Sequence, residues 1–474
     1  MSATTFFAAV TAYIVLVCGI GLWSFRRASS SEGFLVAGRS LGPILGGATL
    51  MANQVSAGAT IGMVGFHYFS GISYAWTWPL VWLGWLVAAV FVAPKIRNIK
   101  GLTLPDYFAA RYDSPAARAV AAVFILIAYT VMLSAQYQAG GLLFQLVGGL
   151  PYGQALLLVA GITTVYTVLG GMYGNAHVGL LKAALLLGAY ALAVPFLWQH
   201  VGGAESIGNA LHALDPRLTG NWFGWRQLFA ISFAIGLGIA AAPYEISAIY
   251  AMQSRRAARL AIGWSFVFQG CIGVGILLFG LATRVAVPQL PNPDLGTPIL
   301  GMSLLPGWIG MLVLLAAVVT LTRTGGAILL TAASAVSHDL YGKLLRPDAD
   351  DRTRVFVGRL AVVVFSAIPV VLAWRPFDLV NFIVIYAAKL TVSFLFVPVV
   401  LGLHWRGGTR AGALASMIGG LSTCLLASVV GRPYFFGFDP AEAGVLVSAV
   451  AFIGVSALTR PVAADRLRVF FPSG

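Results

Sequence analysis

The sequence is short of charge. Only 9% of its 474 residues are Asp, Glu, Lys or Arg, whereas 59% are hydrophobic and the mean hydropathy is +0.89. A soluble globule needs more polar surface than this, so the composition excludes a water-soluble fold. Apolar runs of about 20 residues, the length of a membrane-crossing helix, recur from end to end. We therefore predict an all-α polytopic membrane protein.

Motifs for several other chemistries are also missing. The three cysteines, Cys18, Cys271 and Cys424, lie in apolar runs without CxxC or metal-ligand spacing, so we interpret them as small buried hydrophobic residues. The histidines show no metal-ligand spacing either. A phosphate-binding glycine loop and a nucleophile motif are absent, which argues against ATP-driven transport and hydrolysis. We expect no enzyme activity, no cofactor and no metal other than a possible sodium ion, with Na⁺ or H⁺ as the coupling ion.

The formal charge of +14 would suggest nucleic-acid binding in a soluble chain. Here the basic residues fall in short clusters between apolar runs, so we interpret them as topology signals and expect no nucleic-acid partner. About thirteen runs are long enough to span a bilayer. They cover approximately 4–24, 43–68, 72–94, 117–148, 152–171, 177–198, 225–251, 260–284, 306–336, 356–374, 378–404, 411–431 and 441–459.

The distribution of basic residues predicts the orientation. Of the 29 Lys and Arg residues, 21 lie in loops on one side of this arrangement and five on the other. Because Lys and Arg collect in cytoplasmic loops, we expect the N-terminus outside and the C-terminus inside a plasma (inner) membrane. Arg26 and Arg27 follow the first run and no basic residue precedes it, which argues against a cleaved signal peptide. The longest loops are too short to form a soluble domain.

The run at 42–71 has apolar flanks but a polar, small-residue centre, which contains Asn53, Gln54, Ser56, Gly58 and Thr60. Within hydrocarbon a helix can open only where it is buried in protein or lines a water-filled cavity. Transporters use such broken helices to bind a cation and a solute. We predict unwinding around Val55–Gly58 and a binding site near the midplane. The alternative is an intact helix whose small residues allow close packing.

A second interruption, GLGIAAAPYE at 236–245, comes five spans after the first. This spacing predicts a core of two inverted five-helix repeats, 43–198 and 225–404. The remaining chain is then an extra helix and loop at 1–42, an extracellular loop at 199–224 and extra helices at 405–474.

Several stretches carry a resemblance to a known family. They are GFLVAGRSLGP at 33–43, LPDYFAARY at 104–112, YTVLGGMYG at 166–174 and ASAVSHDLYGK at 333–343. With the broken helix, they make roughly residues 5–405 similar to the sodium/solute symporter family. The SAVSHDLY ending of the last stretch most resembles the acetate and monocarboxylate branch of that family. The resemblance implies a secondary active transporter that works as a symporter by alternating access.

The resemblance also implies a sodium site. Its positions here are the carbonyls of Ala52 and Val55 together with Thr320, Arg323 and Thr324. This chain departs from the family pattern, because Arg323 replaces the usual hydroxyl and Gly179 replaces an aspartate found in many relatives. We therefore expect the Arg323 guanidinium to fill the sodium position, which favours proton coupling or facilitated transport. The substrate positions that the resemblance implies are Gln54, Ser56, Ala59 and Trp78.

Three charged residues, Glu245, Arg323 and Lys389, lie deep in spans. Such residues usually mark transport pathways, although an ion-pair network that only fixes helices together is the alternative. We expect Glu245 to pair with Arg323 or Lys389, and we assign Glu245 and Lys389 to the substrate site. Lys182, near a helix end, is expected to extend its side chain toward the membrane surface.

These patterns predict an importer of a small organic solute. The net positive charge of the deep residues favours a monocarboxylate or another small anion. An amino acid, proline-like, is the first alternative, and a transporter-like solute sensor that signals to a separate partner is the second. The expected partners are the solute and the lipid bilayer, and the oligomeric state, a homo-oligomer included, is left open.

Overall fold

The computed structural model describes residues 2–25, 29–99, 101–430 and 437–471. Arg26, Arg27, Lys100 and Arg432, which enter the charge comparison above, lie outside these ranges. Within the described residues the regular elements are helices, and eleven are long and apolar enough to cross a membrane. The all-α polytopic architecture is confirmed.

The longer helices are α1 (Ala3–Phe25), α3 (Pro43–Gln54), α5 (Trp78–Val87), α8 (Pro115–Gly148), α9 (Tyr152–His200), α10 (Gly203–Leu214), α11 (Trp225–Ala240), α13 (Arg255–Ala286), α15 (Gly307–Ser334), α16 (Asp351–Leu372), α17 (Val380–Phe396), α19 (Arg410–Val429) and α20 (Pro440–Ala457). The shorter ones are α2 (Ser31–Val36), α4 (Val64–Ser70), α6 (Ala93–Ile96), α7 (Leu104–Tyr112), α12 (Pro243–Ala251), α14 (Gly296–Ile299), α18 (Gly402–His404) and α21 (Ala464–Leu467).

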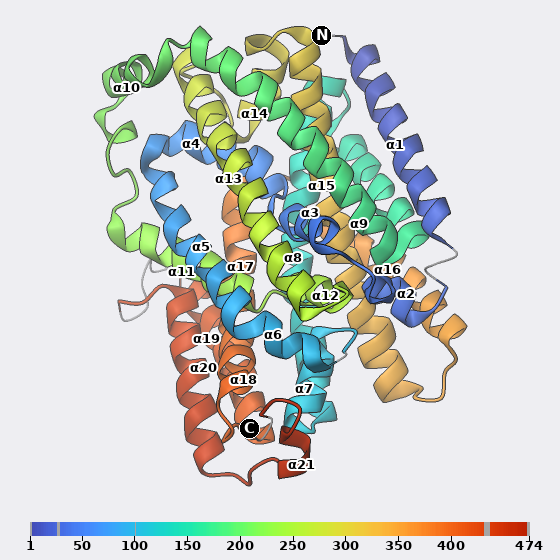
Figure 1. Cartoon of the computed structure of the whole chain (residues 1–474). Helices are drawn as coiled ribbons and strands as arrows, with labels where there is room; N and C mark the ends of the chain where they lie inside the picture. The colour runs from blue at the N-terminus through green and yellow to red at the C-terminus, as the bar shows by residue number, and fades with distance from the viewer. Residues whose placement is uncertain (1, 26–28, 100, 431–436, 472–474) are drawn as a thin grey trace.

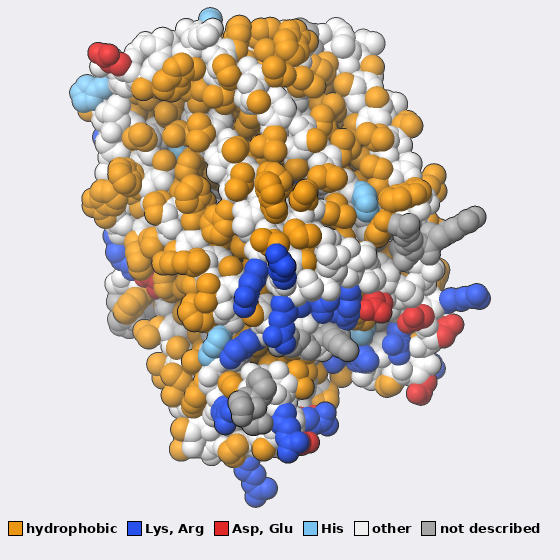
Figure 2. Space-filling model, in the orientation of Figure 1, with side chains coloured by type: hydrophobic (Ala, Val, Ile, Leu, Met, Phe, Trp, Pro, Cys, Tyr) orange, Lys and Arg blue, Asp and Glu red, His pale blue; other side chains and the backbone are white. Residues whose placement is uncertain are grey.

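The helices form one elongated bundle with the two termini at opposite ends (Figure 1). In that view the upper end carries the N-terminus and α10, and the lower end carries α7, α21 and the C-terminus. Lys and Arg side chains gather toward the lower end, whereas hydrophobic side chains cover most of the upper part of the same face (Figure 2). We use "upper end" and "lower end" in this sense below.

Two glycines account for the difference between eleven helices and about thirteen predicted spans. Helix α9 runs for 49 residues, but Gly171 has φ 53° and ψ −154° and divides it into two helical segments. These segments correspond to the predicted spans 152–171 and 177–198. Similarly, Gly71, with φ 63°, separates α4 from the segment that leads into α5. A Cβ atom at Gly71 would lie 1.9 Å from the carbonyl oxygen of Leu218, so another side chain does not fit.

Both predicted helix breaks are present. Helix α3 ends at Gln54, Val55 leaves the helical region with ψ 83°, and a wide helical turn over Gly58–Met63 leads into α4. The unwinding predicted around Val55–Gly58 is therefore confirmed. In the second break, α11 ends at Ala240 and α12 begins at Pro243. Proline suits this first helical position because it has no backbone N–H to leave unpaired.

Helix α15 is the central element, and every residue from Ala316 to Ser334 is buried. A helix that is apolar on all sides belongs inside a bundle. Its small residues allow close contact with α9: the Tyr166 hydroxyl donates to the Thr322 carbonyl at 2.7 Å, over Gly326. This contact fixes the face of α15 that carries Arg323 and Thr324 beside the broken helix.

Candidate functional site

A cavity of about 160 Å³ lies between the two helix breaks. Residues of both breaks and of α5, α8, α11, α13 and α17 line it, and we call it the central cavity. Within the described residues its lining contains no charged side chain. Its polar lining residues are Gln54, Ser56, Tyr74, Trp78, Trp82, Tyr129, Tyr244, Gln269, Asn381 and Thr391.

The four substrate positions from the resemblance, Gln54, Ser56, Ala59 and Trp78, all line the central cavity. The indole Nε1–H of Trp78 is buried and has no acceptor among the described residues. An unpaired buried donor is costly, so Nε1 is available to a polar atom of a solute. The Ser56 hydroxyl oxygen accepts a hydrogen bond from the Gly58 N–H at 3.1 Å, which leaves its own proton free to be donated.

Helix ends give the central cavity its electrostatic character. Ser56 and Gly58 lie where the second half of the first broken helix begins, and Gly238 and Ile239 lie near the end of α11. The N-terminal end of a helix favours negative charge and the C-terminal end favours positive charge. The cavity therefore offers partial charges of both signs without an ionised side chain.

Glu245 does not have the basic partner that we expected. Its Oε1 accepts a hydrogen bond from Gln54 Nε2 at 2.9 Å, and its Oε2 has no hydrogen-bond partner among the described residues. It lies in the first turn of α12, where the helix dipole favours a carboxylate. Glu245 is thus behind the lining and reaches the central cavity through the Gln54 amide.

Lys389 also requires a correction. Its Nζ lies 2.6 Å from Asp439 Oδ2, and Asp439 caps the start of α20. The adjacent residue Ala388 lines the central cavity, whereas Lys389 does not. The ion pair fixes α17 to α20 and takes the Lys389 charge away from the solute.

Arg323 is fully buried but does not occupy the predicted sodium position. Its Nη1 donates to the Asn53 side-chain oxygen, and its Nε donates to the Asn175 carbonyl at 3.3 Å. Asn53 in turn donates from Nδ2 to the Tyr244 carbonyl at 3.3 Å, so Arg323 is linked to the second helix break.

The carbonyls of Ala52 and Val55 are instead bound by Lys182. Its Nζ lies 2.8 Å from the Ala52 oxygen and 3.1 Å from Thr324 Oγ1, and it also donates to the Val55 oxygen. Lys182 is fully buried, so the expectation that it extends to the membrane surface is wrong. The sequence held a usable signal, because Lys182 follows Gly179 by three residues and must share its helix face.

The two threonines of the predicted cation site, Thr320 and Thr324, differ in the hydrogen bonds that their hydroxyls make. Thr324 Oγ1 donates to the Ala52 carbonyl at 2.9 Å and belongs to the Lys182 site. Thr320 Oγ1 donates to the Ala316 carbonyl of its own helix at 2.6 Å. Of the five predicted cation-site residues, Ala52, Val55 and Thr324 therefore converge on one point, and the Lys182 ammonium fills it.

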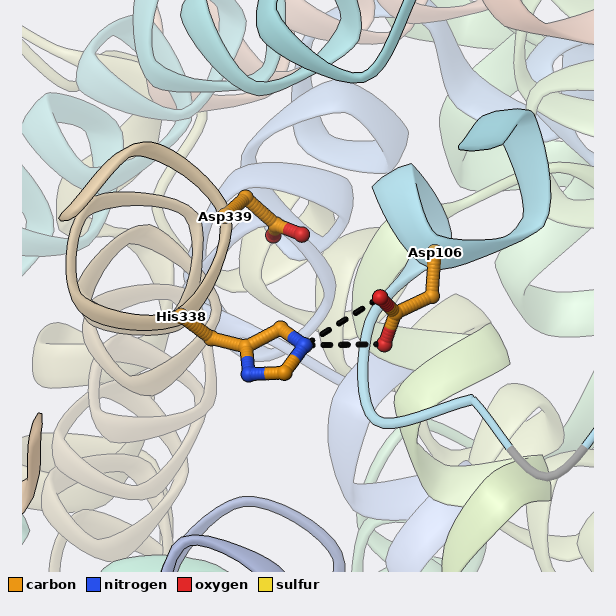
Figure 3. A group of neighbouring side chains, drawn as sticks. All are labelled: Asp106, His338 and Asp339. Carbon is orange, nitrogen blue, oxygen red and sulfur yellow. Dashed lines mark hydrogen bonds and ion pairs between the residues drawn. The ribbon is translucent and has the colours of Figure 1, made fainter. Parts of the chain in front are cut away.

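A separate polar cluster lies at the lower end, where His338 and Asp339 from the continuation of α15 meet Asp106 from α7 (Figure 3). His338 Nε2 lies 3.0 Å from Asp106 Oδ2, and Thr103 Oγ1 donates to Asp339 Oδ1 at 2.9 Å. Arg118 Nη2 lies 3.0 Å from Asp106 Oδ1. The motifs at 104–112 and 333–343 carry these residues, but nothing in the sequence pattern predicted that the two motifs pack together.

This lower-end cluster has atoms of metal-ligand type within 4.8 Å of one another. However, the His338 nitrogen that would bind a metal faces the Asp106 carboxylate, and Arg118 already supplies positive charge. Burial of Asp106 opposes its ionisation, but the hydrogen bond from His338 and the charge of Arg118 hold its pKa well below the usual range. The cluster is a charged, hydrogen-bonded link between α7, α8 and the continuation of α15, in which His338 Nδ1 and Asp339 Oδ2 have no hydrogen-bond partner among the described residues.

Comparison with known proteins agrees with this geometry. The sequence model that describes the sodium:solute symporter family matches residues 34–420 of this chain. The high-affinity proline transporter PutP of Bacillus subtilis is 29% identical over 454 residues, covering 92% of this chain and 95% of the relative. The sodium/proline symporter of Escherichia coli is 30% identical over 436 residues, covering 87% and 86%.

Two solved structures share the fold. A Na⁺-coupled sialic acid symporter in a substrate-bound outward-open state has a TM-score of 0.84 at 17% identity, covering 97% of this chain and 98% of its own. Mhp1, a nucleobase-cation-symport-1 family transporter, has a TM-score of 0.61 at 16% identity, covering 92% and 97%. These relatives and neighbours are transporters rather than enzymes, and their fold is the predicted inverted-repeat core with broken helices. The chain therefore belongs to the sodium:solute symporter family.

Proposed function

We propose that this protein imports a small zwitterionic amino acid, with proline as the first candidate, by alternating access. The observation that carries the proposal is the uncharged central cavity between two helix breaks. A zwitterion can place its carboxylate at the N-terminal helix end near Ser56 and Gly58. Its ammonium group can then face the end of α11. The net charge of the cavity and solute together remains zero.

A monocarboxylate fits this cavity less well, because its negative charge would have no ionised partner. The anion interpretation depended on Arg323 and Lys389, and both have their hydrogen bonds elsewhere. The cavity volume of about 160 Å³ is smaller than the roughly 300–1,000 Å³ of pockets for drug-sized ligands, which favours a small solute. The bacterial relatives named above as proline transporters support the same choice of solute.

We place the lower end of the bundle, and with it the C-terminus, in the cytoplasm. The Lys and Arg side chains that gather toward that end support this orientation (Figure 2). The substrate would then enter from the upper end and leave toward the lower end of a plasma membrane.

Uptake of radiolabelled proline into proteoliposomes tests the proposal. We expect unlabelled proline, but not acetate, to compete with the label. Uptake of acetate without uptake of proline would restore the anion interpretation. Proline binding without accumulation or exchange would indicate a sensor.

Trp78→Phe tests the solute contact because it removes the free Nε1–H and keeps an aromatic ring. A hydrogen bond to a charged group contributes about 1.5 kcal/mol or more, so we expect the proline affinity to fall about tenfold. Trp76→Phe is the matched control, since Trp76 is 55% exposed and does not line the central cavity. Equal affinities in the two variants would remove Trp78 from the solute site.

A further inference from the structure

The Lys182 ammonium is held by three oxygen acceptors in a geometry that uses all of its protons. These acceptors are the carbonyls of Ala52 and Val55 and the hydroxyl of Thr324. Thr324 gives its own proton to the Ala52 carbonyl, so its oxygen faces Lys182 as an acceptor. A protonated lysine has three N–H groups and a neutral one has two. The site is therefore complete only when Lys182 is charged.

The two backbone carbonyls are available because α3 ends there. The last carbonyls of a helix have no partner within the helix, and a buried one needs another donor. The helix break thus creates the oxygen ligands, and α9 supplies a cation to satisfy them. A second cation would lie within contact distance of the Lys182 nitrogen, so the ammonium excludes a sodium ion from this position.

The charged groups around Lys182 are few. Arg323 on α15 is the charge that acts on it directly, and α3 presents backbone oxygens at this point. Glu245 on α12 accepts a hydrogen bond from Gln54, and the hydrogen bonds of Lys182 go to Ala52, Val55 and Thr324 instead. Tyr13 on α1 and Tyr166 on α9 face the Thr322–Arg323 part of α15. Lys182 is consequently held in place by neutral oxygen ligands, as a bound metal cation would be, rather than by a carboxylate.

We infer that the Lys182 ammonium is the resident cation of this site, so that the residues present do not fit a sodium ion there. The inference rests on the proposed function, since it concerns how solute movement is driven. Charged Lys182 ties the first helix break to α9 and α15.

Proline accumulation in proteoliposomes tests this directly, with an inward proton gradient, an inward sodium gradient or neither. For the wild type we expect the sodium gradient to have no effect on accumulation, and sodium-driven accumulation in the wild type would overturn the inference. Lys182→Ala vacates the position between the Ala52 and Val55 carbonyls and the Thr324 hydroxyl, so in this variant we expect sodium to stimulate proline uptake. A sodium effect of the same size in the wild type and in Lys182→Ala would also overturn it.

Lys389→Gln is the matched control, because it removes another lysine within a span, whose ammonium is paired with Asp439. We expect it to remain insensitive to sodium. If Lys182→Ala does not transport proline, the wild-type gradients decide the question alone.

A measurement without solute separates this inference from the proposed function. Thermal unfolding of the purified wild type in NaCl and in choline chloride should give the same Tm, since the cation position is filled. A sodium-specific rise in Tm would overturn the inference even if proline proved to be the wrong solute. Failure of proline transport under every gradient, with no sodium effect on Tm, would instead count against the proposed function.

Discussion

Gly179 and Arg323 share one space: a Cβ atom at Gly179 would lie 3.2 Å from the Nε atom of Arg323. The missing side chain on α9 therefore makes room for the long one on α15. Both positions depart from the pattern that the family resemblance implies. The structure shows that they are two parts of one arrangement, which also brings Arg323 to Asn53.

Gly179→Ala should lower the thermal stability of the wild type. The new methyl group would lie 3.2 Å from Arg323 Nε, so the fully buried guanidinium must shift slightly, and overpacking of this kind costs about 1–3 kcal/mol. In an Arg323→Ser background the same substitution should be neutral or stabilising, because alanine favours a helix by up to about 1 kcal/mol over glycine. Thermal unfolding of the four proteins measures this coupling. An equal loss of Tm in both backgrounds would contradict the shared space.

Glu245→Gln should keep proton-driven accumulation, because the Gln side-chain oxygen can still accept from Gln54. Glu245→Ala leaves the Gln54 amide without this acceptor, so its proline affinity should fall further than that of Glu245→Gln. Uptake against pH and proline concentration distinguishes the two effects. Loss of accumulation with retained exchange in Glu245→Gln would make Glu245 the proton carrier.

Asp106→Asn should destabilise the lower-end cluster in a pH-dependent way. The pKa of Asp106 is held below its usual value, so its contribution to stability is present above about pH 4, the unfolded value. It is lost as the pH falls toward the folded value. The difference in Tm between the wild type and Asp106→Asn should therefore be constant near neutral pH and shrink in acid.

Asp113→Asn provides the control for that measurement. Asp113 is exposed and lies 3.7 Å from Arg466, a surface pair of little energetic weight. Its Tm should follow that of the wild type at each pH. A pH-independent penalty in Asp106→Asn would show that shape, and not charge, holds the cluster together.

Asp294→Asn should remove a pH dependence of thermal stability whose sign is opposite to that of the Asp106 contribution. Asp294 is buried in the turn Pro293–Leu295, outside the spans, and its Oδ2 accepts from the Val380 N–H at 2.9 Å. Burial raises the pKa of Asp294 to about 7, and the charge of Asp378 acts in the same direction. Because the folded value is raised, this contribution to stability is full below about pH 4 and is lost as the pH rises through about 7.

Thermal unfolding between pH 4 and pH 8 checks this prediction. The wild-type Tm should contain a component that falls over this range, and Asp294→Asn should lack it while keeping an acceptor for the Val380 N–H. Parallel pH profiles would mean that Asp294 does not titrate in the folded protein.

Hydrophobic patterning alone determined the all-α membrane architecture, since runs of about 20 apolar residues have no other stable arrangement in a bilayer. The polar centre at 53–60 and the GLGIAAAPYE stretch likewise located both helix breaks from the amino-acid sequence by itself. These are local properties, because a helix opens where its own residues permit it. Gln54 and Ser56, which line the central cavity, could be predicted for the same reason, because they lie in the broken helix.

Only the tertiary structure decided where the buried charges go. A lysine or arginine side chain reaches several ångströms, so its partner depends on which helices are adjacent and on their rotation. Lys182 was expected at the membrane surface and Arg323 at the cation position, yet Lys182 holds the Ala52 and Val55 carbonyls while Arg323 binds Asn53. Lys389 forms an ion pair with Asp439 for the same reason. Span patterns determine the depth of a charge, but helix packing selects its partner.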